Sequence, residues 1–274
     1  MKKKYVLLPL LMMIFSLNAQ HSIMTYNIRY NNPNDKENWW ENRKEDVAKL
    51  ISHYKPDILG IQEGLHDQVT YLDDTLTNYS YVGVGRDDGK QKGEYAAIFF
   101  NPDSLEILDT KTYWLSDTPH MVSVGWDASM ERIVTYAMFK DKNTKKTIHV
   151  FNCHYDHIGK EARKNSSKLV LGLINDMEIQ DEPIAVIGDL NSHPDDEPIQ
   201  ILKAELDDAF EISKIPAHGP IGTFNGFNPD KKPTARIDYI LTKNIPVISY
   251  DAIDDRRENN LYPSDHLPIF SLLY

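Results

Sequence analysis

Hydrophobic and polar residues alternate along the chain in many short apolar runs, with a few amphipathic stretches between them. Residues 41–54 predict a helix whose apolar side carries Val47, Leu50 and Ile51. Further helices are predicted at 65–76, 160–179 and near 197–205. Strands are predicted at 22–30, 56–64, 94–101, 105–115, 182–191, 236–242, 247–253 and 267–274, and residues 132–155 predict a hairpin around the polar turn 141–146. The strands at 94–101 and 105–115 are expected to pair, and the whole pattern favours one α/β domain of two packed sheets flanked by helices.

The first 19 residues have the pattern of a secretory signal peptide. Lys2, Lys3 and Lys4 precede an apolar run and then small residues that end at Ala19. A buried first helix would not crowd three lysines at one end, and the apolar run is too short for a membrane anchor. We therefore expect cleavage after Ala19, a domain of residues 20–274, and a secreted or periplasmic protein with no stable membrane anchor.

The composition limits which disulfide bonds can form and which kinds of partner can bind. The 274-residue chain is 41% hydrophobic and has a single cysteine, Cys153, so no internal disulfide can form and this thiol is expected to be packed inside. The formal net charge is −11, and removal of the three lysines of the leader makes it −14. This charge argues against a broad basic surface for nucleic acid, although an acidic ligand can bind where a divalent cation offsets its charge.

The segment 186–199 places polar chemistry directly after an apolar run. Its sequence is VIGDLNSHPDDEPI, in which Asp189 and Asn191 follow the run two residues apart. Side chains two apart on an extended segment point the same way, so this pair would face one point beyond the end of the strand. A metal or phosphate site would use such a pair, and a helix cap or Asx-turn explains it equally well.

Several other predicted strands also end on residues that can hold a metal ion or a phosphate. Loops gathered at one edge of a rigid sheet are where sites are built. One such residue alone is explained by a structural role, whereas a set at similar places in separate strands is hard to explain by turn chemistry. The further members of the set are Asn27 in MTYN, Glu63 in LGIQE, His154 in FNCH, Asp238 in RIDYIL, and Asp265 and His266 in SDH.

The motifs around these residues resemble those of the endonuclease/exonuclease/phosphatase superfamily of metal-dependent phosphoesterases, which includes pancreatic DNase, sphingomyelinases and deadenylases. They occur in the superfamily's order along nearly all of the mature chain: TYNIR, IQE, GEYAAIFF, FNCHYDH, GDLNSHPDDEP, TFNGF, RIDYIL and SDHLPI. The resemblance implies a DNase I-like four-layer αββα sandwich with two mixed sheets. The stretches NIRYNNPNDKENWWENRK and GVGRDDGKQKGEY look like an exported bacterial branch.

The resemblance also implies roles at the metal and the phosphate. Glu63 matches the metal carboxylate, which would hold Mg²⁺, Mn²⁺ or Ca²⁺ with waters, as hard cations prefer oxygen ligands. Asp265 would supply a further metal or supporting oxygen. Asn27 would orient the metal site and touch phosphate, and Arg29 would reach a phosphate or make an ordinary surface salt bridge.

The remaining residues match positions that act on the scissile bond. Asp189 and Asn191 would position the attacking water and the phosphoryl oxygens. His266 would act as base or transition-state donor, oriented by Asp238, because a carboxylate partner fixes the imidazole tautomer and raises its pKa.

His154 resembles the histidine that meets the scissile phosphate from the other side in the DNase branch, with Glu94 as its partner. In-line displacement at phosphorus requires an activated water, neutralisation of the equatorial oxygens and help for the leaving oxygen.

Weaker candidates surround this set. Arg132 and Arg236 suit a phosphate or a salt bridge. Asp156 and His157 are expected in a loop, and His193 is expected to be exposed. The aromatic residues in or beside loops are expected to pack, or to form a wall for a substrate group; they are Trp39, Trp40, Trp114, Trp126, Phe224 and Phe227.

The sequence thus favours an exported, metal-dependent hydrolase of phosphodiesters or phosphomonoesters. The alternatives are a secreted endonuclease or exonuclease that acts on DNA or RNA, a non-catalytic binding protein on the same scaffold, and an unrelated carbohydrate-binding module. The sequence does not choose among a phosphorylated small molecule, a lipid head group and a nucleic acid as substrate, because fold alone does not select one. It does not give the oligomeric state either.

Overall fold

The computed structural model describes residues 21–274, and the predicted signal peptide at residues 1–19 lies outside the described residues. Twelve strands within this range form two six-stranded sheets. Among the helices of residues 21–274, none is both long and apolar enough to span a membrane.

The first sheet has the strand order β11-β12-β1-β2-β4-β3. Its central pair, β1 and β2, is parallel, and its other neighbours are antiparallel, so the sheet is mixed. Its strands are β1 (His21–Asn27), β2 (Ile58–Gln62), β3 (Ser80–Val82), β4 (Ile98–Phe100), β11 (Val247–Ala252) and β12 (Ile269–Leu273).

The second sheet has the order β5-β6-β7-β8-β10-β9 and repeats the same plan, with a parallel central pair, β7 and β8. The hairpin predicted at 132–155 is confirmed, because β6 and β7 pair antiparallel across a short turn. The strands are β5 (Leu105–Trp114), β6 (Ile133–Asp141), β7 (Thr147–His154), β8 (Ile184–Asp189), β9 (Asp207–Asp208) and β10 (Asp238–Lys243).

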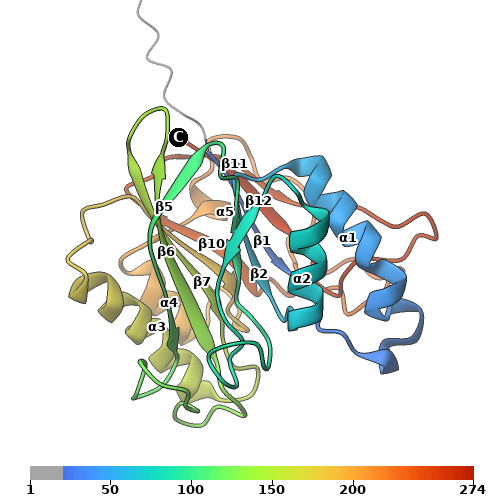
Figure 1. Ribbon diagram of the computed structural model, residues 1–274, viewed down its shortest axis with the longest axis horizontal. Coiled ribbons are helices and arrows are strands. Elements are labelled where there is room, and N and C mark those ends of the chain that lie inside the picture. Colours follow the sequence, from blue (N-terminus) through green and yellow to red (C-terminus); the bar gives the residue numbers. More distant parts are fainter. Residues whose placement is uncertain (1–20) are drawn as a thin grey trace, which may run out of the picture.

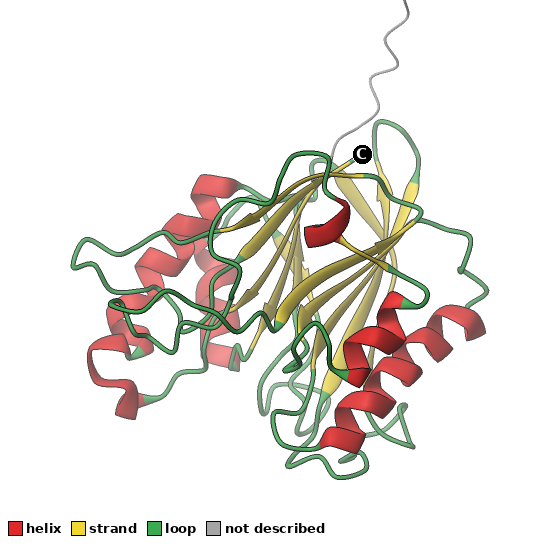
Figure 2. Cartoon of the chain, turned by 180° about the vertical axis from the view of Figure 1, so that it is seen from behind, coloured by secondary structure: helices red, strands yellow, loops and turns green. Residues whose placement is uncertain are grey.

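Helices cover the outer face of each sheet, which gives four layers (Figure 1). The first sheet is covered by α1 (Trp40–Tyr54) and α2 (His66–Thr75), and the second by α3 (Lys160–Asp176) and α4 (Glu197–Lys203). A one-turn helix, α5 (Ala209–Ile212), follows β9, and a 3₁₀ segment, η1 (Pro33–Asn38), precedes α1. Seen from behind, the strands lie between the two groups of helices (Figure 2). The predicted αββα sandwich is confirmed.

Three apolar layers hold the sandwich together. Side chains of both sheets meet in the middle, among them Ile23 and Ile58 from the first sheet and Val150 and Ile187 from the second, all fully buried. Each outer face packs on its own helices in a separate cluster. Because residues of the central strands are buried on both faces, these strands read as continuous apolar runs in the sequence.

The expected pairing of strands 94–101 and 105–115 is wrong. β4 pairs with β2 and β3 in the first sheet, whereas β5 pairs with β6 in the second. Phe100 and Leu105 both point into the core between the sheets, so the short turn after β4 carries the chain from one sheet to the other. Two apolar strands separated by a turn fit a crossover between sheets as well as a hairpin.

A glycine fixes the end of β8. Gly188 has φ +138°, and a Cβ atom there would lie 2.0 Å from the carbonyl oxygen of Cys153 on the neighbouring strand β7. No other residue fits this close approach without moving a strand. The glycine therefore lets β7 and β8 stay paired up to their last residues, His154 and Asp189.

Two buried amides connect the sheets near the same ends. The Nε2 atom of Gln62, on β2, donates to Oδ1 of Asn152, on β7, at 2.6 Å. The Nδ2 atom of Asn152 donates to the carbonyl oxygens of Ile61 and Ala97, both at 2.9 Å. Both amide side chains are fully buried. Apolar packing tolerates sliding, whereas these hydrogen bonds fix one position of β7 against β2.

Asn152→Ala is expected to lower the free energy of unfolding by about 2–3 kcal/mol, because it leaves buried donors and acceptors without their partner. Urea denaturation of residues 20–274 measures the change. Asn34→Ala, at an exposed asparagine, is the matched control and should change stability by less than about 0.5 kcal/mol. A loss no larger than the control's would show that the amides do not couple the sheets.

Candidate active site

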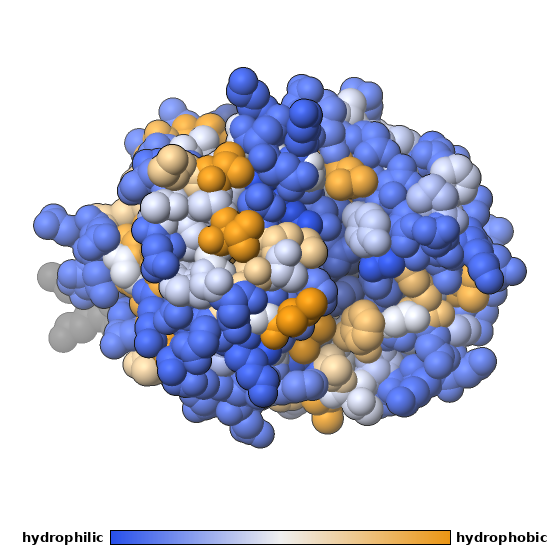
Figure 3. All heavy atoms as spheres, turned by 90° about the horizontal axis from the view of Figure 1, so that it is seen from below, coloured by the Kyte–Doolittle hydropathy of each residue, from blue (hydrophilic) through white to orange (hydrophobic). Residues whose placement is uncertain are grey.

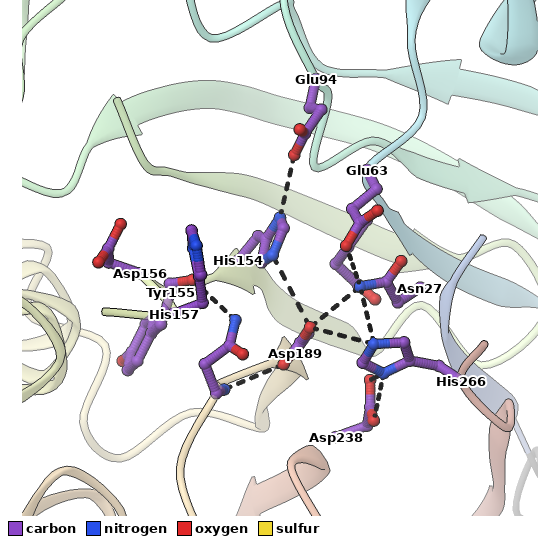
Figure 4. Close-up of polar contacts among 12 residues, drawn as sticks. Asn27, Glu63, Glu94, His154, Tyr155, Asp156, His157, Asp189, Asp238 and His266 are labelled. Atoms are coloured by element: carbon purple, nitrogen blue, oxygen red, sulfur yellow. Dashed lines mark hydrogen bonds and ion pairs between the residues drawn. The ribbon is translucent and has the colours of Figure 1, made fainter. Parts of the chain in front are cut away.

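The predicted polar residues meet where the central strands of both sheets end. Asn27 is the last residue of β1, and Glu63 follows β2. His154 and Asp189 end β7 and β8, and Asp238 begins the antiparallel β10 that pairs with β8. The figure shows these side chains, with that of His266, pointing toward one another from opposite sheets (Figure 4).

The segment 264–266 is fixed against the end of β1. The Ser264 hydroxyl donates to the carbonyl oxygen of Asn27 at 2.7 Å. Of the two residues after Ser264, His266 then reaches the centre of the cluster and Asp265 its edge. His266 directs Nδ1 to Asp238 at 2.9 Å and Nε2 toward Asp189 at 3.8 Å. The expected pairing of His266 with Asp238 is therefore present in the structure.

Asn27 lies at the centre of the cluster. Its Nδ2 atom donates to Oε1 of Glu63 and Oδ2 of Asp189, both at 3.0 Å, and is 3.4 Å from Nε2 of His266. Its Oδ1 atom accepts the backbone N–H of Arg29 at 3.0 Å. These contacts orient the amide, with its N–H groups directed at the carboxylates.

Glu63, Asp189 and His266 can converge on a cation. One ligand atom of each lies within 4.8 Å of the others. The Glu63 backbone is left-handed, with φ 64°, a strained conformation for a non-glycine residue that often marks functional positions. Two carboxylates and an imidazole suit a divalent ion, and hard cations favour the carboxylate oxygens. The donor set therefore fits the expected metal.

Asp265 and Arg29 lie at the edge of this cluster. Nη1 of Arg29 is 3.8 Å from Asp265 and 4.0 Å from Glu63, so one guanidinium faces both carboxylates. The same side chain pairs twice with Asp35, at 2.9 and 3.1 Å. Asp265 is outside the group of three converging ligands, and its predicted metal role stays a prediction.

His154, the last residue of β7, lies close to Glu94, which belongs to the loop before β4. Nδ1 of His154 is 3.6 Å from Glu94, and Nε2 is 3.7 Å from Asp189. The first distance is longer than a direct hydrogen bond. Glu94 instead accepts two hydrogen bonds from Arg86, at 2.7 and 3.0 Å. The sequence analysis gave Arg86 no role, although it is the arginine of the stretch GVGRDDGKQKGEY.

Asn191 takes part in a turn and also lines the site, which are the two alternatives that its motif left open. Its backbone N–H donates to Oδ1 of Asp189 at 3.0 Å, which is the Asx-type turn, and its Nδ2 atom donates to the carbonyl oxygen of Tyr155. Asn191 is also left-handed, with φ 46°, and lines the pocket. Turn chemistry thus positions the residue inside the site.

Burial and crowding raise the pKa values of the carboxyl groups. Burial, followed by repulsion from Asp238, raises the pKa of Asp189 to about 7. Burial and repulsion from Glu63 raise the pKa of Glu94 to about 7. Burial also raises the pKa of Asp265. A divalent cation among these groups would stabilise their charged forms.

The two histidines are shifted in opposite directions. Burial alone would lower the pKa of His266, but the carboxylates of Asp238 and Asp189 outweigh it and raise the value well above the ordinary one. The pKa of His154 is lowered well below its ordinary value by burial and then by the guanidinium of Arg132. Asp189 thus lies between one imidazole with a raised pKa and one with a lowered pKa.

A buried arginine makes hydrogen bonds to two segments beside the ends of the central strands. Arg43, on α1, donates to the carbonyl oxygens of Ile28, Arg29 and Pro263 at 2.5, 2.7 and 3.1 Å. It therefore holds the segment after β1 and the segment before Ser264 together. Nothing in the sequence distinguished this arginine from a surface residue of an amphipathic helix.

The weaker candidates from the sequence differ in whether they line the pocket. Arg132 lines the pocket, whereas Arg236 pairs with buried Asp208 at 2.8 Å. His193 is exposed, as expected. Trp40 is buried, and Phe224 is 42% exposed and packs edge-on against His266 with ring centroids 5.0 Å apart. Among the aromatic residues that were predicted to pack or to form a wall for a substrate group, Phe224 thus lines the pocket.

The residues enclose a pocket of about 560 Å³. Glu63 and Asp265 line it together with His154, His157 and Phe224. Viewed from below, this end of the molecule is hollowed, with hydrophilic residues in the recess and hydrophobic patches beside it (Figure 3). Carboxylates, histidines and arginines thus line the same pocket.

Comparisons with known proteins agree with this geometry. A model of the endonuclease/exonuclease/phosphatase family matches residues 24–266. A crystal structure of a protein of that family from Bacteroides vulgatus superposes with a TM-score of 0.88 at 36% identity, over 93% of this chain and 99% of that one. A mannosyl-6-phosphatase of Bacteroides thetaiotaomicron superposes with the same TM-score at 33% identity, over 93% and 99% of the two chains.

A viral relative matches a shorter region. An uncharacterized protein of Acanthamoeba polyphaga mimivirus is 33% identical over 161 residues, which is 56% of this chain and 59% of the viral protein. The chain thus covers less than two thirds of the length of that relative.

Glu63→Gln is expected to weaken Mg²⁺ binding by roughly 10- to 100-fold, because it removes a charged oxygen ligand from the centre of the cluster. Calorimetric titration of the purified protein with MgCl₂ measures the affinity. Glu106→Gln, on the exposed side of β5, should bind Mg²⁺ as the unchanged protein does. Equal affinities in all three proteins would remove Glu63 from the metal site.

Asp189→Asn is expected to lower kcat by at least roughly 10²-fold and to leave the melting temperature unchanged or higher. The amide keeps the volume and the turn but cannot accept a proton, and it relieves the crowding with Asp238. Steady-state kinetics and thermal melts separate the two effects. Asp195→Asn, in the same loop and exposed, is the control. Full activity in Asp189→Asn would show that Asp189 has only a structural role, in the turn with Asn191.

Proposed function

The chain belongs to the endonuclease/exonuclease/phosphatase family, and on that basis we propose that it is a phosphoesterase that requires a divalent metal ion. The observation that supports this most is the convergence of Glu63, Asp189 and His266 within 4.8 Å, with the amide of Asn27 between them. The set combines a cation site, a proton acceptor and hydrogen-bond donors, which are the groups that attack on phosphorus requires.

Glu63 would hold the metal ion, with Asp189 or Asp265 as the second carboxylate. Mg²⁺, Mn²⁺ and Ca²⁺ all suit oxygen ligands. When bound, such an ion polarises a phosphoryl oxygen and offsets negative charge.

The protein's own groups supply the remaining chemistry. Asp189, with an accepting oxygen and a raised pKa, is suited to orient and deprotonate the attacking water. The Nδ2 atom of Asn27 is suited to donate to a phosphoryl oxygen. His266, charged and oriented by Asp238, stabilises negative charge that develops in the transition state. His154 reaches the same space from β7.

The substrate is proposed to be a small phosphorylated molecule, with a sugar phosphate as the first candidate. Three observations support this choice. The pocket of about 560 Å³ has the size of a small-molecule site. The net charge of −11 disfavours a polyanion. A relative of 33% identity over nearly the full chain is a mannosyl-6-phosphatase.

We further propose that residues 1–19 direct export and are removed. The support is the sequence pattern of three lysines, an apolar run and small residues up to Ala19. The buried lone thiol of Cys153 is compatible with an oxidising compartment, because a fully buried sulfur is shielded from oxidants.

The proposed activity is tested with p-nitrophenyl phosphate, bis-p-nitrophenyl phosphate and mannose 6-phosphate. Hydrolysis of at least one ester is expected with MgCl₂ or MnCl₂, with loss in excess EDTA and recovery when the metal is restored, because the crowded carboxylates require a cation. Release of nitrophenol and of inorganic phosphate measures the reaction. Activity that survives EDTA would exclude the metal requirement, and no hydrolysis with either metal would exclude the function.

A further inference from the structure

Three arginines line the pocket, and they differ in their partners. Arg29 makes two hydrogen bonds to Asp35, and Arg86 makes two to Glu94. Arg132 is 4% exposed and directs only Nε to a carboxylate, Asp156, at 3.3 Å. Both of its terminal nitrogens face imidazole rings instead. A guanidinium arranged in this way positions histidines as well as balancing charge.

Asp156 makes this arrangement rigid. It is buried, and Oδ2 accepts from the backbone N–H and the hydroxyl of Ser129 at 3.0 and 2.7 Å. Oδ1 accepts the backbone N–H groups of Ile158 and Gly159 at 2.8 and 2.6 Å. One carboxylate thus fixes the loop that precedes Arg132 and the loop that carries His157.

The contacts of Arg132 place the two imidazoles side by side. Its Nη1 atom is 3.1 and 3.3 Å from the ring nitrogens of His154. Its Nη2 atom donates to Nδ1 of His157 at 2.8 Å. Because one guanidinium carries both nitrogens, His157 lies next to His154, which reaches the catalytic Asp189 at 3.7 Å.

The same hydrogen bond determines which nitrogen of His157 can donate. A guanidinium has no acceptor, so Nδ1 of His157 must accept and the ring hydrogen must be on Nε2. Donation from a charged group also polarises the ring and strengthens the Nε2–H as a donor. His157 is exposed and lines the pocket, so this N–H is available to a substrate. Its orientation is nevertheless fixed by Arg132.

We propose that His157 is a specificity residue that donates from Nε2 to a non-bridging oxygen of a phosphomonoester and so favours monoesters over diesters. The proposal rests on the phosphoesterase function proposed above. A strengthened N–H donor beside a guanidinium suits a charged oxygen better than a neutral one. A monoester carries a third, charged non-bridging oxygen, and a diester carries an esterified oxygen in its place.

The experiment compares p-nitrophenyl phosphate with bis-p-nitrophenyl phosphate, which share a leaving group and differ at this one oxygen, where the diester carries a second nitrophenyl group. His157→Phe is expected to lower kcat/KM for the monoester by about 10- to 100-fold, the value of a hydrogen bond to a charged group, and for the diester by less than about 3-fold. His157→Gln keeps an N–H donor near the position of Nε2 and should restore most of the monoester activity.

A second measurement does not depend on turnover of the monoester. With the diester as reporter substrate, inorganic phosphate should inhibit the unchanged protein more strongly than dimethyl phosphate does. His157→Phe should weaken inhibition by inorganic phosphate by about 10-fold and leave inhibition by dimethyl phosphate unchanged. His193→Ala is the matched control, because His193 is an exposed histidine of the neighbouring loop outside the pocket.

The outcomes separate this proposal from the function on which it rests. If the unchanged protein hydrolyses neither nitrophenyl ester nor mannose 6-phosphate with metal, both are overturned. If it is active and His157→Phe reduces both esters equally, or neither, the phosphoesterase function stands and the role of His157 is overturned. Thermal melts of His157→Phe and His157→Gln show whether both variants are folded, and a folded His157→Gln without recovery also overturns the donor role.

Discussion

The hydrogen bond between Gln62 and Asn152 is the contact on which the geometry of the site depends. The catalytic groups come from two sheets, and each sheet is completed separately by its own strands. Gln62 immediately precedes Glu63, and Asn152 lies two residues before His154, so the two amides join the halves next to the residues they position. An apolar core between the sheets permits several registers at similar energy, whereas the hydrogen bonds of Gln62 with Asn152, and of Asn152 with Ile61 and Ala97, form in one register only.

The charge distribution of the site follows from the same burial. Asp189 and Glu94 are largely buried and lie close to other carboxylates, so their charged forms are disfavoured. His266 takes the opposite shift because the same carboxylates surround it. The fold thus gathers carboxylates and arginines around one pocket, with Arg29 close to Glu63 and Arg86 paired with Glu94. A phosphate group with its metal ion complements this mixed lining, since it carries charges of each sign.

The sequence predicted the layers, most elements and the strand-end residues, because alternation and order along the chain carry that information. It did not predict features that depend on contacts between distant residues or on the backbone conformation of the folded chain. Strands β4 and β5 were expected to pair, since nothing local tells a hairpin from a crossover between sheets. Arg43 was given no role, because its partners are backbone carbonyl oxygens that only the fold brings to it. The left-handed backbone of Glu63 is invisible in a sequence, and the contact of Arg132 with His157 joins residues 25 positions apart.

The pairing of β1 with β12 joins the first strand of the described residues to the last. His21 pairs with Leu273, and His266 lies just before β12, so the first sheet and the cluster around Asn27 are both completed only when β12 is in place. Contacts of such long sequence separation form slowly. The cluster around Asn27 is therefore expected to form late in folding, after β12 has paired with β1, and no local element completes it alone.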